Sequence, residues 1–344
     1  MANEDISALT VEQMALFTKL EGIFMPQATK QRDDSYGQAA SSAFGNSVRF
    51  VHYTSAEAAL KIINSKRMWM RNTMCMSDYS EVQHGFGILQ KFFSDKAKTD
   101  QFIAALDVCV PGAAAEAIDF FNRWWSDIQS HTYITSISEH DKQEDFHGRL
   151  SMWRAFGGNA ARVAFVFNIP WSSGSGQALN LMFSPVAYLT ENETHAVIYK
   201  VIENIAENHD FLRSVDRQTI VGSVFNMLIA GVTCLKHEGF REEREWRAIY
   251  SPHRSPSELM ESSTEVIAGI PQLVYKIPLD VKASPALADL ELSRIFDRLI
   301  IGPSEFSRPM YEAFQEALKN AGVPPETEKQ RIFISGIPIR STNA

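Results

Sequence analysis

The spacing of hydrophobic residues divides the chain into helical and strand segments. Apolar side chains recur at helical spacing over residues 6–22, which predicts an N-terminal helix. Residues 28–47 are polar, small and glycine-bearing, which is typical of a linker or a mobile segment. We therefore expect an N-terminal helix and linker over residues 1–45, followed by a single domain over residues 46–344.

Short runs of β-branched and aromatic residues predict the strands of that domain. These runs are residues 48–54, 131–138, 162–170, 245–250, 273–279, 298–303 and 331–337. Helical spacing instead marks residues 54–66, most of 78–127, the long stretch 194–238, and 305–321. Thr54 is the predicted N-cap of the first of these helices, because Glu57 follows three residues later and completes a capping box. The mixture predicts an α+β fold with a helical insertion at about residues 194–238.

The composition argues against several classes of function. A formal net charge of −8 does not suit a chain that coats nucleic acid non-specifically, since that mode of binding requires a basic surface. The 3 cysteines are an odd number without CxxC spacing, so we expect neither a disulfide framework nor a zinc knuckle, and we expect a reducing, cytoplasmic location. The N-terminal segment is acidic where a signal peptide would be basic, and no apolar run approaches the roughly 18 residues needed to span a bilayer. No association with a membrane is therefore expected.

The stretch FREEREWRAIY, residues 240–250, raises the main question about chemistry. If its last six residues form a strand, Glu245 and Arg247 share one face, and a carboxylate is held beside a guanidinium. If the stretch is a helix, Arg241 with Glu245 and Glu243 with Arg247 make surface pairs worth about 0.3 kcal/mol each. The pattern by itself favours the second interpretation, because charge runs usually cover solvated faces.

Two further stretches suit either ligand binding or core packing. His52 and Tyr53 lie where a strand ends and a helix begins, so they can contact a ligand, cap the helix or fill the core. Trp153 and Arg154 precede a Gly-Gly turn and suit stacking and anion binding, although a buried tryptophan is the commoner role. The histidines and carboxylates of residues 131–147 match no metal-ligand spacing, so no metal is predicted. Motifs of P-loop enzymes, α/β hydrolases and dinucleotide-binding dehydrogenases are missing as well.

Several motifs gain meaning when they are taken in order along the chain. They are FVHYTS, RMWMRN, MSDYSE, YITSISEHDKQEDFHGRLSMWRAFGGNAARVAFVF and KHEGFREEREWRAIY over about residues 49–250, with the later RLIIGP. Together they resemble a bacterial family of unknown function, domain-of-unknown-function family 2971. This family resembles, more distantly, the ADP-ribosyltransferase-like group. The resemblance implies an α+β fold of the ADP-ribosyltransferase-like type, a split β-sandwich with helical insertions that grips NAD in a cleft between two small sheets.

The same resemblance implies roles for individual residues. His52, in the HYT motif with Thr54, matches a histidine that binds the adenosine-side ribose of NAD. Glu245 matches a glutamate that binds the nicotinamide-side ribose and activates the acceptor, and a carboxylate there would stabilise an oxocarbenium-like state. The other candidates are Tyr53 or Trp153 for stacking on nicotinamide, Ser136 or Ser138 for polar support, and Arg154 or Arg247 for the pyrophosphate. Either arginine can instead neutralise a buried glutamate.

The function implied by the resemblance is that of an NAD-dependent ADP-ribosyltransferase. NAD would be its substrate, a protein or nucleic acid its macromolecular acceptor, and a bacterial toxin or phage-defence effector its setting; no metal is required. With water as acceptor, the same site would make an NAD glycohydrolase. An alternative from a different class is a catalytically silent module that keeps the cleft to bind a nucleotide or a nucleic-acid end, because a fold can persist without its chemistry.

Overall fold

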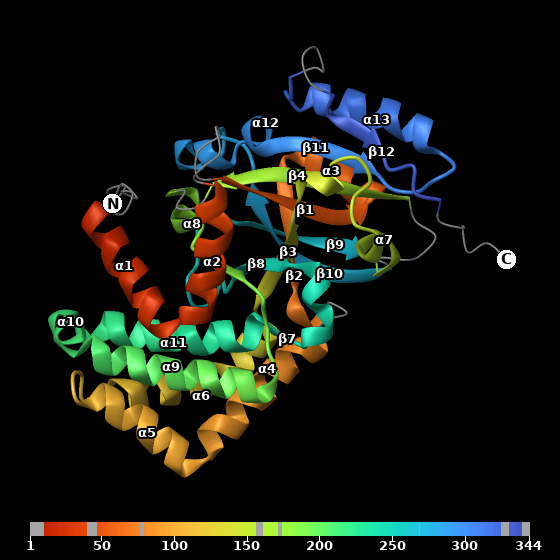
Figure 1. The fold of residues 1–344 in the computed structure, drawn as a ribbon. Coiled ribbons are helices and arrows are strands. Elements are labelled where there is room, and N and C mark those ends of the chain that lie inside the picture. The colour runs from red at the N-terminus through yellow and green to blue at the C-terminus, as the bar shows by residue number, and fades with distance from the viewer. Residues whose placement is uncertain are drawn as a thin grey trace.

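A broad β-sheet and a separate layer of helices make up the molecule (Figure 1). The computed structural model describes residues 10–39, 47–75, 79–155, 161–170, 174–267, 269–324 and 330–338. Within these ranges, ten strands form one sheet with the order β12-β11-β4-β1-β3-β2-β10-β9, and β8 joins it by pairing with β3 and β5. Helices and a mixed sheet occur in one chain, so the predicted α+β class is confirmed.

Seven of the ten described strands of the large sheet correspond to the predicted runs of β-branched and aromatic residues. They are β1 (Ser47–Ser55), β2 (Arg67–Asn72), β3 (Tyr133–Glu139), β4 (Arg162–Pro170), β5 (Met182–Pro185), β8 (Glu245–Tyr250), β9 (Glu261–Ile267), β10 (Ile270–Pro278), β11 (Phe296–Ile301) and β12 (Ile332–Ile334). Strands β2, β5 and β9 were not predicted. The edge strand β9 gives no apolar signal, because most of its side chains are polar and exposed. A two-residue pair, β6 (Ala187–Tyr188) with β7 (Leu235–Lys236), forms a small second sheet.

Strand β3 lies at a branch point of the sheet. On one side it pairs along almost its whole length with β8. On its other side it is shared, since β2 pairs with Tyr133 and Ile134 whereas β1 pairs with Ser138 and Glu139. The backbone of β3 between these two pairings therefore faces a gap between β1 and β2.

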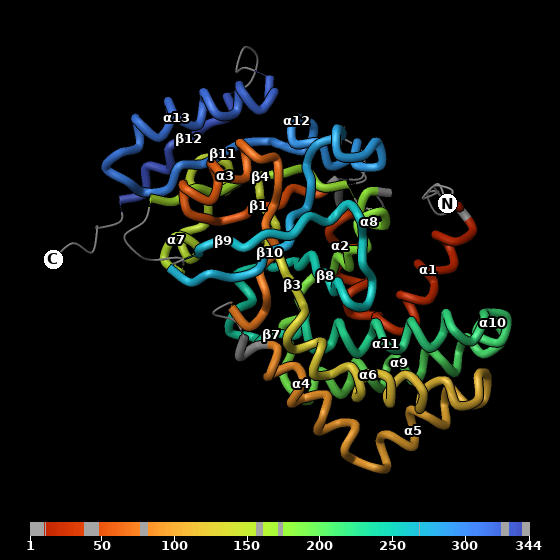
Figure 2. The backbone as a smooth tube through the Cα atoms, turned by 180° about the vertical axis from the view of Figure 1, so that it is seen from behind, coloured from red at the N-terminus to blue at the C-terminus, as the bar shows by residue number. Residues whose placement is uncertain are grey.

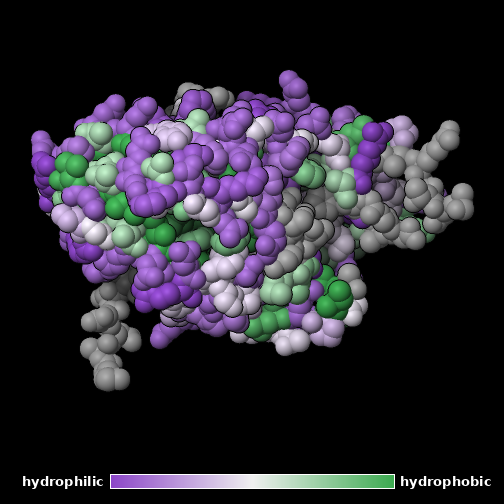
Figure 3. Space-filling view, turned by 90° about the horizontal axis from the view of Figure 1, so that it is seen from below, coloured by the Kyte–Doolittle hydropathy of each residue, from purple (hydrophilic) through white to green (hydrophobic). Residues whose placement is uncertain are grey.

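The helical layer has a hydrophobic core of its own. It is built from α4 (Tyr79–Ser94), α5 (Lys96–Asp107), α6 (Ala113–Ser130), α9 (Glu191–Glu207), α10 (His209–Ser214) and α11 (Arg217–Thr233). Helix α11 lies on the side of the helical layer that faces the sheet (Figures 1 and 2). It contacts α4 and α6, and its apolar side chains belong to this core. The predicted helical insertion, which corresponds to α9–α11, thus shares one hydrophobic core with α4–α6. Seen from below, much of the surface is hydrophilic, with scattered hydrophobic side chains between (Figure 3).

The N-terminal segment differs from the expectation. Helix α1 (Val11–Phe24) is present, but the segment interpreted as a linker is helical from Pro26 to Ala39 and forms α2; residues 40–46 lie outside the described ranges. The interpretation was wrong for α2 because this helix buries few side chains. One of them is Tyr36, which packs on Phe50 of β1 and on Trp246 of β8. Helix α2 therefore covers one face of the large sheet.

The predicted cap of the first internal helix is displaced by one residue. Helix α3 (Ala56–Ser65) has Ser55 as its N-cap, and the Ser55 hydroxyl accepts a hydrogen bond from the backbone N–H of Ala58. Thr54 still belongs to β1, so its predicted capping role is wrong. The remaining helices are α7 (Leu150–Ala155), α8 (Gly174–Ala178), α12 (Leu292–Ile295) and α13 (Ser307–Asn320). None of the helices in the described ranges is long and apolar enough to cross a membrane.

Candidate functional site

Glu245 is the first residue of the central strand β8. Residues Glu238–Glu243 form a 3-10 helix, Arg244 turns the chain in a left-handed conformation with φ of 44°, and β8 then begins. The strand interpretation is therefore correct for residues 245–250. Glu245 lies directly opposite Ser138 of β3, and Arg247 lies opposite Ser136. The two charged side chains consequently point to the same face of the sheet.

A buried network of charges surrounds Glu245. The side chains of Glu245 and Arg247 are only 5% and 3% exposed, and Arg247 Nε lies 2.7 Å from Glu245 Oε1. Arg247 Nη2 contacts Glu245 Oε2 at 3.1 Å, while Arg247 Nη1 donates to the carbonyl of Thr233 at the end of α11. Lys236 of β7 is also buried, and its Nζ lies 3.4 Å from Glu245 Oε2 and 2.6 Å from Glu243 Oε2. The network thus joins β8, the small sheet and the helical layer.

These contacts fix the charge of Glu245. Burial by itself raises the pKa of a carboxyl, but attraction to Arg247 and hydrogen bonds from it, together with Lys236, outweigh this and lower the pKa of Glu245 to about 2. The Ser136 hydroxyl adds to the lowering, although it makes no hydrogen bond of ordinary geometry. A general base works best when its pKa lies near the working pH. In this arrangement Glu245 is therefore a stable anion held by two cations, which is the neutralised buried glutamate that the sequence left open.

The backbone N–H of Glu245 is satisfied by a residue that the sequence analysis missed. Tyr188 of β6 accepts this hydrogen bond through its hydroxyl at 2.8 Å. Burial raises the pKa of Tyr188, so the phenol stays neutral at physiological pH. No sequence pattern relates Tyr188 or Lys236 to Glu245. The two residues lie next to each other because β6 pairs with β7, although Tyr188 is far from β8 in the sequence.

The candidate residues divide between the two faces of the sheet. Val51 of β1 is paired with Ser138 and hence shares the face of Glu245. Because side chains alternate along a strand, Tyr53 points to this face as well, whereas His52 and Thr54 point to the opposite one. The residues whose strand positions place them on the Glu245 face are Tyr53, Ser136, Ser138 and Arg247. The structure therefore brings most strand candidates to one face but separates His52 from Glu245.

His52 fills the gap where β1 and β2 diverge from β3. Its Nδ1 lies 3.0 Å from the backbone oxygen of Ser136, and since a carbonyl can only accept, Nδ1 is the donor. Burial lowers the pKa of His52, and the hydrogen bond to Ser136 opposes this only in part. The ring thus serves as a neutral donor to a carbonyl that neither neighbouring strand reaches.

The two aromatic candidates pack against each other. Trp153 of α7 meets Tyr53 edge to face with ring centroids 4.9 Å apart, and both rings are buried. Their polar atoms are occupied: the Tyr53 hydroxyl accepts from the backbone N–H of Arg149 at 2.7 Å, and Trp153 Nε1 donates to the carbonyl of His147 at 2.7 Å. Burial raises the pKa of Tyr53 to about 12. Arg154, one residue along α7, is exposed.

A cleft on the opposite face of the sheet was not predicted. It has a volume of about 350 Å³ and lies between helices α1 and α2 and the strands β3, β5 and β8. Its lining is mainly apolar and includes Met14, Phe17, Ala28, Ile137, Phe183 and Ala248. A charged pair joins the two helices in this lining, since Arg32 Nη1 lies 2.6 Å from Glu21 Oε2. The cleft could not be predicted while the residues of α2 were interpreted as a linker.

Comparison with known proteins identifies a family for the middle of the chain. Residues 152–248 match the model of a family described as a protein of unknown function, DUF2971. The chain carries a DUF2971 region. This confirms the family that the ordered motifs indicated, and the relationship to ADP-ribosyltransferases stays a prediction. No curated protein and no solved structure matches the chain.

The DUF2971 region contributes to both faces of the sheet. It begins on α7, just before Trp153, and ends on β8 at Ala248. It therefore contains the whole buried network of Lys236, Glu243, Glu245 and Arg247. It also supplies the β5 and β8 walls of the apolar cleft, whereas α1 and α2 lie outside the match.

Proposed function

We propose that this protein is a binding module that holds a small, largely apolar molecule between its N-terminal helices and the large sheet. The observation that carries the proposal is the cleft of about 350 Å³ with its mainly apolar lining. Ligand sites are commonly concave, apolar and furnished with a few polar groups, and this volume lies in the range of such sites. The proposal differs from the silent binding module expected from the sequence, which would keep the NAD cleft and bind a nucleotide or a nucleic-acid end.

The charged pair in the lining suggests one feature of the ligand. Arg32 is bound to Glu21 and Asp33, and its side chain is only 8% exposed. Burial raises the pKa of Glu21 although Arg32 attracts its charge, but the Glu21 side chain is 38% exposed, so this end of the cleft is in contact with solvent. A neutral polar group on an otherwise apolar ligand suits this end, because the carboxylates of Glu21 and Asp33 outnumber the single guanidinium of Arg32. We therefore expect an amphiphilic molecule.

The lining offers little for catalysis. Among the described residues that line the cleft, the charged side chains are Glu21 and Arg32, and these two pair with each other. Histidine and cysteine do not occur in that described lining. A nucleophile with a neighbouring general base, as covalent catalysis requires, is therefore not provided by it. Binding is the simpler function for this face.

Filling the cleft tests the proposal. Ala28→Trp places an indole in the lining, and Lys30→Trp adds the same ring to an exposed position of the same helix. Binding of the neutral fluorescent amphiphile 6-propionyl-2-dimethylaminonaphthalene would be titrated, with displacement by a medium-chain alcohol and with circular dichroism to check folding. We expect saturable binding by the wild type and the Lys30→Trp variant, and at least about tenfold weaker binding by Ala28→Trp. Equal affinity of the two variants would refute the cleft as the site.

A second candidate function is the transfer of ADP-ribose from NAD to a macromolecular acceptor, or its hydrolysis with water as acceptor. It is supported by the presence of Tyr53, Ser136, Ser138 and Arg247 on the same face as Glu245. For this chemistry, NAD would have to draw Lys236 or Arg247 away from the Glu245 carboxylate. Arg154 is exposed on α7 and would be free to approach a pyrophosphate.

Release of free nicotinamide from NAD tests the second candidate. The time course would be followed for the wild type, for Glu245→Gln and for the control Glu261→Gln, whose glutamate lies on the edge strand β9. Cell lysate would supply an acceptor. Release that requires Glu245 but not Glu261 would support an NAD-consuming enzyme, and a further requirement for lysate would indicate transfer. Absence of release by the folded wild type in both conditions would reject this function.

A further inference from the structure

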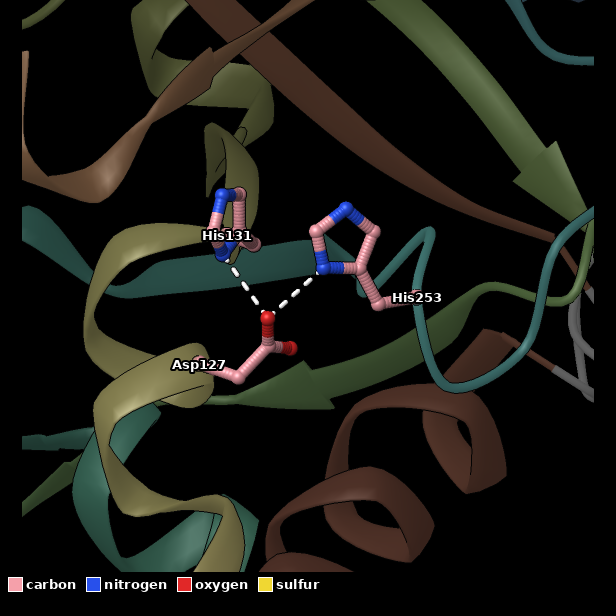
Figure 4. A group of neighbouring side chains, drawn as sticks. All are labelled: Asp127, His131 and His253. Carbon is pink, nitrogen blue, oxygen red and sulfur yellow. Dashed lines mark hydrogen bonds and ion pairs between the residues drawn. The ribbon is translucent and has the colours of Figure 1, made fainter.

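We propose that Asp127, His131 and His253 form a binding site for a divalent transition-metal ion of the zinc class. The site shares no residue with the described lining of the cleft or with the Glu245 network. It lies at the end of α6 and in the loop that follows β8 (Figure 4). Among the described residues, this is the group of at least three histidine, cysteine or acidic side chains whose ligand atoms lie within 4.8 Å of one another.

Local structure explains why these side chains converge. Asp127 and His131 are four residues apart at the end of α6, so they project from the same side of the helix. His253 comes from the turn between β8 and β9, 126 residues further along the chain than Asp127. Both imidazoles approach the same carboxylate oxygen through Nδ1: His131 at 2.8 Å and His253 at 2.6 Å from Asp127 Oδ1. The two rings lie 4.2 Å apart and flank that oxygen (Figure 4).

The donor set suits a particular class of ion. Imidazole nitrogens and one carboxylate are common ligands of Zn²⁺, and ions of this type lie about 2.0–2.2 Å from each donor. Two ligands of a tetrahedral ion lie roughly 3.4 Å apart, so the nitrogen–oxygen distances of 2.8 and 2.6 Å would have to lengthen by less than about 1 Å to admit the ion. It would also replace the contact of 3.0 Å between Ser130 Oγ and His131 Nδ1. Three protein ligands leave a coordination position for water or for a ligand.

The position of the site gives such an ion a structural consequence. The side chains of His131 and His253 are 41% and 50% exposed, so an ion can reach them from solvent. An ion bound there would tie the end of α6, in the helical layer, to the loop that leaves β8, in the large sheet. The absence of a metal-ligand spacing in residues 131–147 does not conflict with this, because His253 and Asp127 lie outside that stretch.

Titration of the purified, metal-free protein tests the proposal. Zn²⁺ binding would be measured by calorimetry and Co²⁺ binding by its visible absorption, which reports nitrogen and oxygen ligation. We expect one ion per chain and a rise in melting temperature with Zn²⁺. His131→Asn and His253→Asn should each weaken binding by about 100-fold, because even indirect partners of metal ligands are worth about 10–100-fold. These side chains are partly exposed, so the variants should fold.

A matched histidine control separates this site from adventitious binding. His237 lies near His84, with ring centroids 6.2 Å apart, but that pair is not part of a described group of three candidate ligands. His237→Asn should bind Zn²⁺ as the wild type does. Loss of binding in His237→Asn, unchanged binding in the double variant His131→Asn/His253→Asn, or no saturable binding by the wild type would each overturn the proposal.

Discussion

The two faces of strand β8 differ sharply in chemistry although they belong to the same six residues. On one face, Glu245 and Arg247 form a closed ion pair whose hydrogen-bonding atoms are occupied. On the other, Trp246 packs into an aromatic cluster and Ala248 lines an open apolar cleft. The charged face of β8 is therefore committed to holding the molecule together, whereas its apolar face has space for a ligand. In this protein, the residues that resemble catalytic groups lie on one face of β8, and the space for a ligand lies on the other face.

Breaking the ion pair should produce the largest effect. Arg247→Met leaves Glu245 buried with Lys236 as its main cation, and breaking a buried pair typically costs about 3–5 kcal/mol. The measurement is the free energy of unfolding from urea titration. The matched control is Arg123→Met, which removes an exposed partner of Asp119 and should cost less than about 1 kcal/mol.

A double variant sharpens this result. Glu245→Leu/Arg247→Met removes both charges. It should be more stable than Arg247→Met, because it does not leave the Glu245 carboxylate buried without its arginine. Equal free energies of unfolding for Arg247→Met and Arg123→Met would contradict the structural role of the pair, and would favour the catalytic interpretation of Glu245.

The charge of Glu245 also predicts how stability depends on pH. The folded-state pKa of about 2 lies below the ordinary value of 4.5, so the stabilisation is present above pH 4.5 and is lost as the pH falls towards 2. A shift of this size corresponds to about 3 kcal/mol. We expect the difference in unfolding free energy between the wild type and Glu245→Gln to shrink by this order between pH 6 and the acid limit of folding.

Salt provides the internal check on the pH experiment. Added salt screens exposed charges strongly but buried pairs weakly, so the difference between wild type and Glu245→Gln should not change with ionic strength. A difference that is constant with pH, or that vanishes in high salt, would show that Glu245 is solvated and would remove the contrast between the two faces.

The sequence predicted the elements of this contrast better than their surroundings. Alternation along residues 245–250 correctly placed Glu245 and Arg247 on one face, and β-branched runs located most strands of the sheet. The charge run was nevertheless expected to be solvated, because burial depends on Lys236 and Tyr188 and on α11, which distant pairings bring together. The cleft was missed for a similar reason. Helix α2 has a polar sequence and packs through few side chains such as Tyr36, so its pattern indicates a linker.

His52 belongs neither to the ion pair nor to the described lining of the cleft. Its replacement should therefore have the smallest effect on the free energy of unfolding. His52→Phe keeps a ring in the gap of the sheet but removes the donor to the Ser136 carbonyl, which we expect to cost about 1–2 kcal/mol. His52→Gln keeps an amide donor and should cost less. Because the pKa of His52 is lowered from 6.5, its contribution is complete above pH 6.5 and is lost as the pH falls below that value.

The two proposed functions make opposite predictions for this variant. If His52 only closes the gap between β1 and β2, the loss of stability in His52→Phe should follow pH as described, and binding of the amphiphile in the cleft should stay unchanged. If His52 instead binds the ribose of NAD, His52→Phe should retain its stability and lose affinity for NAD, as measured by calorimetry. The second result would require the His52 ring to leave the Ser136 carbonyl and to reach the face of Glu245. Strand β1 would then have to rearrange when NAD binds, and the two faces would not be fixed in the arrangement described above.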